Sequence, residues 1–211
     1  MDRHVQIATF SRISQVSRET ITSLKKYEKM LINSNKSINL IGNSTIKDIW
    51  NRHFLDSFQV IDFIEKNEKS LIDIGSGAGF PGLVLAIAAK DRKIPIKITL
   101  IDKSPKKIIF LKKIIGELNL KVETMSSNIF IEPVKLEEGV LLARAFKPLE
   151  IILKLIHKNA KNWKKIFIFL GKSGKTELLQ ASKSWDIKYK QRVSITSSDS
   201  LVIEINELKK K

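Results

Sequence analysis

The sequence predicts an α/β protein with a mostly parallel sheet, an antiparallel final strand and a helical extension at the N-terminus. From about residue 70, short apolar runs alternate with stretches of helical periodicity, which is typical of parallel strands joined by right-handed crossovers. A glycine-rich turn joins the first such run to the helix after it. The last two strand-like runs have no helix between them, so we expect them to pair antiparallel.

The N-terminal region is predicted to be helical. Apolar residues follow helical spacing from about residue 17, and the Asn- and Ser-rich stretch 33–44 interrupts them. A second helix is predicted after this stretch and opens with a capping box over Thr45–Asp48. On the flank of that helix, Arg52 and Asp56 stand four residues apart, a spacing that favours an ion pair.

The domain organisation follows from this pattern. We expect residues 1–66 to form a helical extension packed on the core, and residues 67–211 to form one compact unit. A length of 211 residues allows one generous domain with such an addition, and a hydrophobic content of 43% provides a real core.

The glycine-rich turn is the most informative stretch. Residues 73–82 read Asp-Ile-Gly-Ser-Gly-Ala-Gly-Phe-Pro-Gly, which places an acid in the strand and glycines at 75, 77 and 79 in the turn. This spacing differs from the G-x-G-x-x-G of dinucleotide-binding folds. S-adenosylmethionine has no phosphate but carries an amine, a sulfonium and a carboxylate. Asp73 suits its cationic portion and loop amides suit its carboxylate, so the pattern favours this ligand over NAD.

A second acid supports the same interpretation. Residues 96–101 form the next predicted strand, and Asp102 ends it, where an acid accepts hydrogen bonds from ribose hydroxyls in nucleotide-type folds. Pro105 then begins a helix at a first-turn position.

The remaining elements bring further polar residues to the same edge. Strands are predicted over residues 121–125, 139–143, 165–170, 187–193 and 201–206, and helices over 148–160 and 175–183. In a parallel sheet the carboxyl ends of the strands meet at one crevice, where ligands bind. Asp102, Asn128, Arg144 and Lys172 all follow strand ends and are expected around the glycine turn.

Composition excludes several classes of function. The chain has no cysteine, so it has no disulfide framework, no thiolate metal site and no thiolate nucleophile for methylation at C5 of a pyrimidine. No leader sequence or apolar run of membrane-spanning length is evident. We therefore expect a cytoplasmic protein with no membrane association and no metal, and we expect a monomer.

The charge balance points to a polyanionic partner. With 38 Lys and Arg against 22 Asp and Glu, the formal net charge is +16. An excess of this size favours nucleic acid, although part of it reflects a composition rich in Lys, Ile and Asn.

Three segments together resemble the small-subunit ribosomal RNA guanine-N7 methyltransferases, the glucose-inhibited division protein B family. They are residues 73–82, residues 52–57 (Arg-His-Phe-Leu-Asp-Ser) and residues 143–146 (Ala-Arg-Ala-Phe), and the resemblance runs from about Tyr27 to the final strand. It implies a Rossmann-like class I S-adenosylmethionine-dependent methyltransferase fold. It further implies that S-adenosyl-L-methionine is the methyl donor. The implied substrate is the guanine at position 527, in the 530 loop of bacterial 16S rRNA.

The resemblance also implies roles for individual residues. Gly75 and Phe80 match the donor loop, Asn128 and Ile129 match contacts on the adenine side, and Arg144 matches an arginine facing both donor and target base. The donor-binding set expected from pattern and resemblance together is Asp73, Gly75, Ser76, Gly77, Gly79, Phe80, Asp102, Asn128, Ile129 and Arg144. RNA contacts are expected at Arg52, His53 and Lys172. The family often has arginine where this chain has Asn128, and Lys-Gly where it has Gly171-Lys172.

The implied chemistry needs no general base, because guanine N7 presents a lone pair and bears no proton. Arg144 is therefore assigned to orientation of the base, and alignment of N7, methyl and sulfur supplies the catalysis. The RNA partner is either free 16S rRNA or the 30S subunit. Three alternatives remain: a small-molecule or other RNA methyltransferase of the same fold, a non-catalytic RNA-binding module, and an NAD-linked oxidoreductase, which the glycine spacing disfavours.

Overall fold

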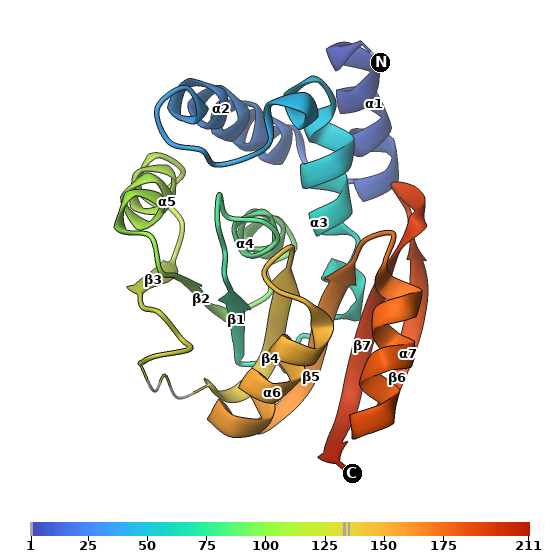
Figure 1. Cartoon of the computed structure of the whole chain (residues 1–211). Coiled ribbons are helices and arrows are strands. Elements are labelled where there is room, and N and C mark those ends of the chain that lie inside the picture. Colours follow the sequence, from blue (N-terminus) through green and yellow to red (C-terminus); the bar gives the residue numbers. More distant parts are fainter. Residues whose placement is uncertain (1, 133, 135) are drawn as a thin grey trace.

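A computed structural model describes residues 2–132, 134 and 136–211, and its centre is a seven-stranded sheet (Figure 1). The strand order is β3-β2-β1-β4-β5-β7-β6. The first five strands are parallel, and β7 is antiparallel to both β5 and β6. The predicted mostly parallel sheet with an antiparallel end is confirmed. The strands are β1 (Ser70–Ile74), β2 (Lys97–Asp102), β3 (Val122–Ser126), β4 (Leu136–Arg144), β5 (Ala160–Leu170), β6 (Trp185–Ser194) and β7 (Ser197–Lys210).

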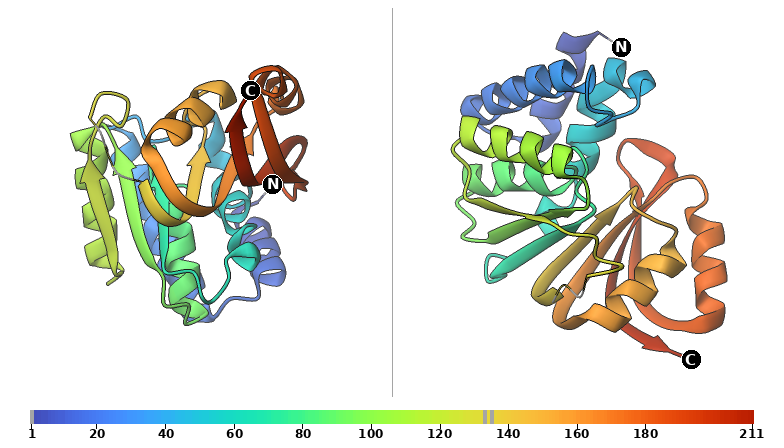
Figure 2. Two further views of the ribbon diagram at one scale, coloured as in Figure 1. Left: turned by 90° about the horizontal axis from the view of Figure 1, so that it is seen from below. Right: turned by 60° about the vertical axis from the view of Figure 1, so that its left-hand side comes forward.

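Helices cover both faces of this sheet (Figures 1 and 2). Two hydrophobic clusters lie on opposite faces: one includes residues of α4 (Gly82–Asp91) and α5 (Pro105–Glu117), the other residues of α6 (Leu149–Asn159) and α7 (Gly174–Ser184). Helices α5, α6 and α7 begin within two residues of their predicted starts, and Pro105 occupies the first turn of α5 as predicted.

The N-terminal region adds a helical layer on the α4–α5 face. It contains α1 (Arg3–Ser14) and α2 (Arg18–Asn35), followed by short turns of helix. Helix α1 was not predicted, because only one of its large apolar residues is fully buried. That residue is Phe10, which packs edge-on against Trp50 with ring centroids 5.4 Å apart. The polar Gln6 lies beside it, fully buried, and donates to the carbonyl oxygen of Lys47.

The second predicted helix of this region is not continuous. It is divided into η1 (Asn43–Asp48, a 3-10 helix), η2 (Trp50–Leu55, a π-helical turn), α3 (Asp56–Phe58) and η3 (Ile61–Phe63, a 3-10 helix). The predicted capping box is wrong, because Gly42 is the cap residue and the Thr45 hydroxyl donates to the carbonyl oxygen of Gly42.

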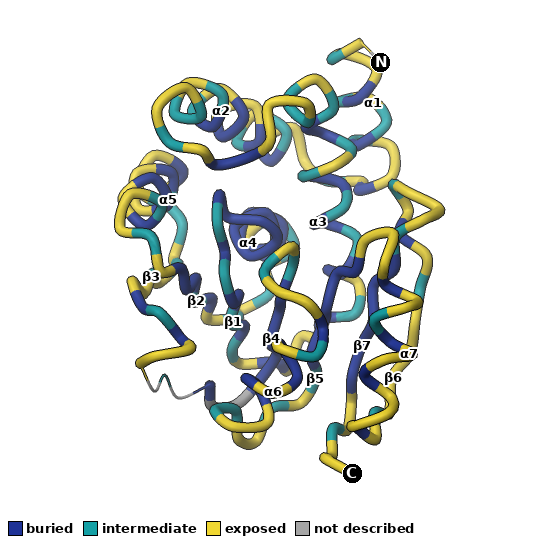
Figure 3. The backbone as a smooth tube through the Cα atoms, viewed as in Figure 1, coloured by how far each residue is buried: buried dark blue, intermediate teal, exposed yellow. Residues whose placement is uncertain are grey.

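The N-terminal helices and the sheet share one apolar core (Figure 3). Phe10, Tyr27 and Phe54 belong to the same cluster as Leu83 of α4 and Val140 of β4. The N-terminal layer therefore packs directly on the sheet and its helices. The predicted domain boundary near residue 66 stays a prediction. Within the described ranges, no helix combines the length and apolar character needed to cross a bilayer.

Candidate active site

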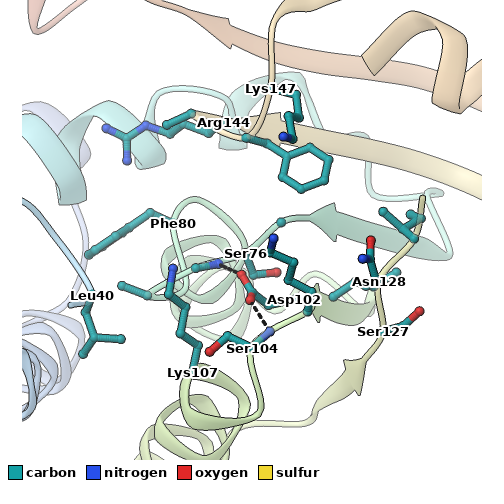
Figure 4. A pocket seen from close by; sticks show the side chains of 18 of the residues that line it. Leu40, Ser76, Phe80, Asp102, Ser104, Lys107, Ser127, Asn128, Arg144 and Lys147 are labelled. Atoms are coloured by element: carbon teal, nitrogen blue, oxygen red, sulfur yellow. Dashed lines mark hydrogen bonds between the residues drawn. The ribbon is translucent and has the colours of Figure 1, made fainter. Parts of the chain in front are cut away.

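A cavity of about 820 Å³ opens at the carboxyl ends of the parallel strands. Residues after β1, β2, β3 and β4 line it, and residues 40–42 of the N-terminal layer close one side. The side chains labelled in Figure 4 surround this space, with Asp102 and Ser104 on one wall and Arg144 on the other. The sheet thus gathers residues far apart in sequence at the edge where parallel sheets bind ligands.

The glycine turn is tight because two of its glycines have no room for a side chain. Gly75, Gly77 and Gly79 have φ angles of +73°, +57° and +99°. A Cβ atom at Gly75 would lie 2.0 Å from the Phe146 ring, and one at Gly79 would lie 2.6 Å from the Tyr27 hydroxyl. At Gly77 the nearest atom would be 3.8 Å away, so that position requires glycine only through its backbone conformation.

Asp73 lies behind the turn rather than on the cavity surface. It is fully buried, and its Oδ2 accepts the amide of Gly82 at the start of α4, at 2.9 Å. Its Oδ1 is buried and has no hydrogen-bond partner among the described residues. Burial raises the pKa of this carboxyl to about 7. Asp73 therefore fixes the junction between turn and helix, and its predicted attraction for the donor's cation stays a prediction.

Asp102 does line the cavity, and two amides hold its carboxylate. Oδ2 accepts the N–H of Gly77 at 2.9 Å and Oδ1 accepts the N–H of Ser104 at 2.8 Å (Figure 4). The carboxylate is thereby fixed in orientation and still has lone pairs for hydroxyl donors, as a ribose would provide.

The segment after β3 forms the far end of the cavity. Asn128 and Ile129 line it as predicted, and the Asn128 side chain accepts the amide of Phe130 at 3.3 Å. Sequence reasoning missed the aromatic pair beside them: Phe130 and Phe146 stack with centroids 5.5 Å apart and planes 17° apart. Phe146 belongs to a quoted motif, but nothing in the spacing indicated Phe130. Lys107 and Lys147 also line the cavity and were not predicted.

Arg144 ends β4 and forms the opposite wall. Its Nη2 lies 2.8 Å from Oδ2 of Asp56 and also donates to the carbonyl oxygen of Arg52. Its guanidinium carbon is 5.9 Å from the centroid of the Phe169 ring. The predicted pairing of Arg52 with Asp56 is wrong among the described residues, because the π-helical turn alters the helical spacing and Asp56 faces the sheet edge instead.

His53 lies on the same wall as Arg144. Its ring stacks on Phe80 with centroids 4.9 Å apart, and Nε2 is 2.9 Å from the Thr45 hydroxyl oxygen. Because that hydroxyl already donates to Gly42, it accepts the Nε2 proton of His53. Burial, with added repulsion from Arg144 and Arg52, lowers the pKa of His53 to about 3. The imidazole is therefore neutral at physiological pH and adds no positive charge to the cavity.

The structure brings most of the predicted site residues together, but not all of them. Those lining the cavity are Gly75, Ser76, Gly77, Phe80, Asp102, Asn128, Ile129, Arg144 and His53. Asp73 and Gly79 support the turn from behind, and the side chain of Arg52 is exposed. Lys172 lies outside the cavity with 87% of its side chain exposed, and its Nζ is 3.6 Å from Asp199.

These features define what the cavity can bind. It offers one oriented carboxylate, apolar and aromatic surface, and one arginine held in place. The turn amides expected for a carboxylate are already engaged, because those of Gly75 and Ser76 donate to the carbonyl oxygen of Ile101 and that of Gly77 donates to Asp102. In the part of the chain that the structure describes, no cluster of three or more His, Cys, Asp or Glu side chains could hold a metal ion.

Comparisons with known proteins agree with this geometry. The family model GidB, described as rRNA small subunit methyltransferase G, matches residues 20–203. Ribosomal RNA small subunit methyltransferase G of Pelagibacter ubique (strain HTCC1062) is 41% identical over 198 residues, which are 93% of this chain and 92% of the relative. The protein of the same name from Rickettsia akari (strain Hartford) is 38% identical over 196 residues, 93% of this chain and 98% of its own.

The fold also matches solved structures. A TehB-like SAM-dependent methyltransferase from Corynebacterium glutamicum superposes with a TM-score of 0.54 at 16% identity, over 72% of this chain and 87% of that one. At this identity the match concerns the fold alone, and it confirms the predicted class I methyltransferase architecture.

Proposed function

The chain belongs to the rRNA small subunit methyltransferase G family, and from this premise we propose that it methylates N7 of a guanine in 16S rRNA. The proposed guanine is the one at position 527 in the 530 loop. The methyl donor is S-adenosyl-L-methionine. One observation carries the proposal: a single cavity has the glycine turn and Asp102 on one wall and Arg144 on the other.

The residues present fit the donor. The fixed carboxylate of Asp102 suits ribose hydroxyls, and the glycine turn, which lines the cavity, lets a ligand approach its backbone closely. Asn128 and Ile129, at the far end of the cavity, would contact the adenine ring. When bound, the donor supplies an activated methyl group on a sulfonium.

The chain's own residues then provide alignment rather than proton transfer. Guanine N7 attacks with its lone pair, the new N–C bond forms as the C–S bond breaks, and S-adenosylhomocysteine leaves. Holding the reacting atoms in line supplies about 7–11 kcal/mol. Arg144 orients the target through the base O6 or a neighbouring phosphate. The neutral imidazole of His53 adds no positive charge to the cavity.

The RNA reaches this cavity from a basic surface. Lys107 and Lys147 line the cavity and suit phosphate groups, and Arg52 and Lys172 are exposed. A base stacked in a helix is inaccessible, so the target must be presented in a loop or flipped out. An rRNA substrate, free or within the 30S subunit, places the reaction in the cytoplasm.

The test uses bacterial cells that lack their own member of this family. Expression of this chain is expected to restore one 7-methylguanosine to a 16S rRNA fragment that contains position 527, as read by mass spectrometry. The variant Arg144→Ala, produced to the same level, is expected to restore little of it. If the wild-type chain leaves the fragment unmodified, the proposed reaction is wrong.

A further inference from the structure

Asp56 is the acidic side chain that holds Arg144 at the cavity wall. Its Oδ2 lies 2.8 Å from Nη2 of Arg144, and the two side chains are only 13% and 15% exposed. The residues come from distant elements, since Asp56 begins α3 and Arg144 ends β4. An ion pair this well shielded is weakly screened by solvent and salt.

The other oxygen of the same carboxylate is held equally firmly. Oδ1 of Asp56 accepts the hydroxyl of Ser194 at 2.8 Å and that of Thr196 at 3.0 Å. It also accepts the side-chain amide of Gln59 at 2.8 Å. Ser194 and Thr196 belong to the turn between β6 and β7, so the carboxylate ties that turn to α3 and to β4.

The β6–β7 turn is held by two further hydrogen bonds, one to the residue that follows α3 and one within the turn. The Ile195 amide donates to Oε1 of Gln59 at 3.2 Å, and the Thr196 amide donates to the Ser194 hydroxyl at 3.2 Å. Since three donors restrain Oδ1, the carboxylate cannot rotate, and Oδ2 presents a fixed acceptor to Arg144.

This arrangement leaves part of the guanidinium available. Both of its hydrogen bonds use Nη2, so Nε and Nη1 have no hydrogen-bond partner among the described residues. Arg144 lines the cavity, and Figure 4 shows its side chain on the wall opposite Asp102. A guanidinium anchored through one nitrogen and open at the others is preorganised to receive a base or a phosphate.

We propose that Asp56 is the positioning residue for Arg144, and that the β6–β7 turn (residues 194–197) supplies the hydroxyl groups that keep Asp56 in place. The function of Arg144 toward the target base rests on the proposed methyltransferase reaction. Asp56 touches neither donor nor base in this account and acts only through Arg144.

The principal variant is Asp56→Asn, which keeps an oxygen for the hydroxyl donors but removes the charge that pairs with Arg144. We expect single-turnover methyl transfer to 16S rRNA to fall about a hundredfold, because a misplaced orienting group loses alignment. The affinity for S-adenosylhomocysteine, measured by calorimetry, is expected to stay within about twofold, because the donor wall is untouched. Asp62→Asn is the matched control, since Asp62 is 63% exposed and pairs with Arg92 away from the cavity; it is expected to keep the wild-type rate.

A double-mutant cycle separates positioning from simple support of the fold. In the background of Arg144→Ala, the change Asp56→Asn is expected to have almost no further effect on the transfer rate. Full additivity of the two changes, or a wild-type rate for Asp56→Asn alone, would overturn the proposal. Ser194→Ala removes one of three donors to Oδ1 and is expected to slow transfer only severalfold, which keeps the test valid if Asp56→Asn folds poorly.

A second readout does not depend on the RNA reaction. In nitrogen-15 NMR spectra of the protein alone, the Arg144 guanidinium is expected to show restricted rotation, which Asp56→Asn should abolish while Asp62→Asn should not. An unchanged Arg144 signal in Asp56→Asn contradicts positioning. If instead wild-type protein shows the restricted signal but methylates no rRNA, the proposed function fails while the role of Asp56 stands.

Discussion

The two walls of the cavity are built in different ways. The donor wall, residues 73–82 with Asp102, consists mainly of one continuous segment fixed by backbone amides and by two turn glycines, Gly75 and Gly79, that leave no room for a side chain. The substrate wall is assembled from residues 52–56, Arg144 and the turn 194–197, which meet only in the folded chain and are fixed by side-chain charge and hydroxyl groups. The comparison shows that binding of the donor depends on local backbone shape, whereas orientation of the target depends on long-range polar contacts.

The largest effect is expected from breaking the substrate wall at its centre. Arg144→Ala should lower single-turnover methyl transfer by about two to three orders of magnitude, as loss of one preorganised donor does at other sites. Donor affinity should change little, since Asp102 and the glycine turn do not contact Arg144 through any hydrogen bond among the described residues. Wild-type turnover of this variant would remove Arg144 from the reaction, and its melting temperature shows whether the fold is intact.

The donor wall should be disrupted by added side-chain volume rather than by a change of charge. Gly79→Ala places a methyl group 2.6 Å from the Tyr27 hydroxyl and 2.9 Å from Cβ of Leu83, at a φ of +99°. We expect about 3 kcal/mol less stability in denaturant unfolding, with weaker binding of S-adenosylhomocysteine.

Gly77→Ala is the matched control for Gly79→Ala. Its added methyl group meets no atom closer than 3.8 Å, so only the cost of the left-handed conformation remains, about 1 kcal/mol. Equal losses in the two variants would show that space behind the turn is not what requires glycine.

Acid pH is expected to destabilise the protein through the buried His53. Folding lowers the pKa of His53 from 6.5 to about 3, so the unfolded chain takes up a proton below pH 6.5 that the folded protein refuses. Stability is therefore lost as the pH falls from 6.5 toward 3, by about 1.4 kcal/mol per pH unit at most, or about 2 kcal/mol by pH 5.

Replacement of His53 by glutamine removes this titration. The unfolding free energy of His53→Gln, measured in denaturant at pH 7 and pH 5, should fall by roughly 1–2 kcal/mol less than that of the wild type. His4→Gln, at an exposed position, should keep the wild-type slope. Identical pH slopes for His53→Gln and wild type would contradict the buried neutral imidazole.

The smallest effect is expected outside both walls. Lys172→Ala removes an exposed charge, so RNA affinity should weaken only severalfold at low salt. If Lys172 contacts a phosphate, the log–log salt slope should decrease by about 0.7–0.9. Lys158→Ala, at the far end of α6, is the control and should leave the slope unchanged. An unchanged slope for Lys172→Ala would show that this lysine makes no phosphate contact.

The difference between the two walls explains which parts of the cavity could be predicted from the sequence alone. The donor wall was predictable because Asp73, the glycines and Asp102 act through neighbours close in sequence or at the next strand end. The substrate wall was not, because the pairing of Asp56 with Arg144 depends on a π-helical turn and on a hairpin more than a hundred residues away. Local spacing suggested Arg52 as the partner, and that prediction was wrong.

In the fold too, elements that depend on contacts between distant residues could not be predicted from local sequence patterns. Strands and helices with strong apolar periodicity were predicted within a few residues, as for α5, whose start is fixed by Pro105. Helix α1 was missed because its buried face combines Phe10 with the polar Gln6, whose side-chain amide donates to a carbonyl oxygen in the segment after α2. An inward polar residue satisfied by a distant carbonyl leaves no periodic pattern to detect.

The most direct test of the central claim is a crystal structure with S-adenosylhomocysteine. We predict that the ligand lies in the cavity with its ribose hydroxyls on Asp102, its amino acid portion beside the glycine turn, and its sulfur toward Arg144. An empty cavity at saturating ligand, or a ligand bound elsewhere, would contradict the account.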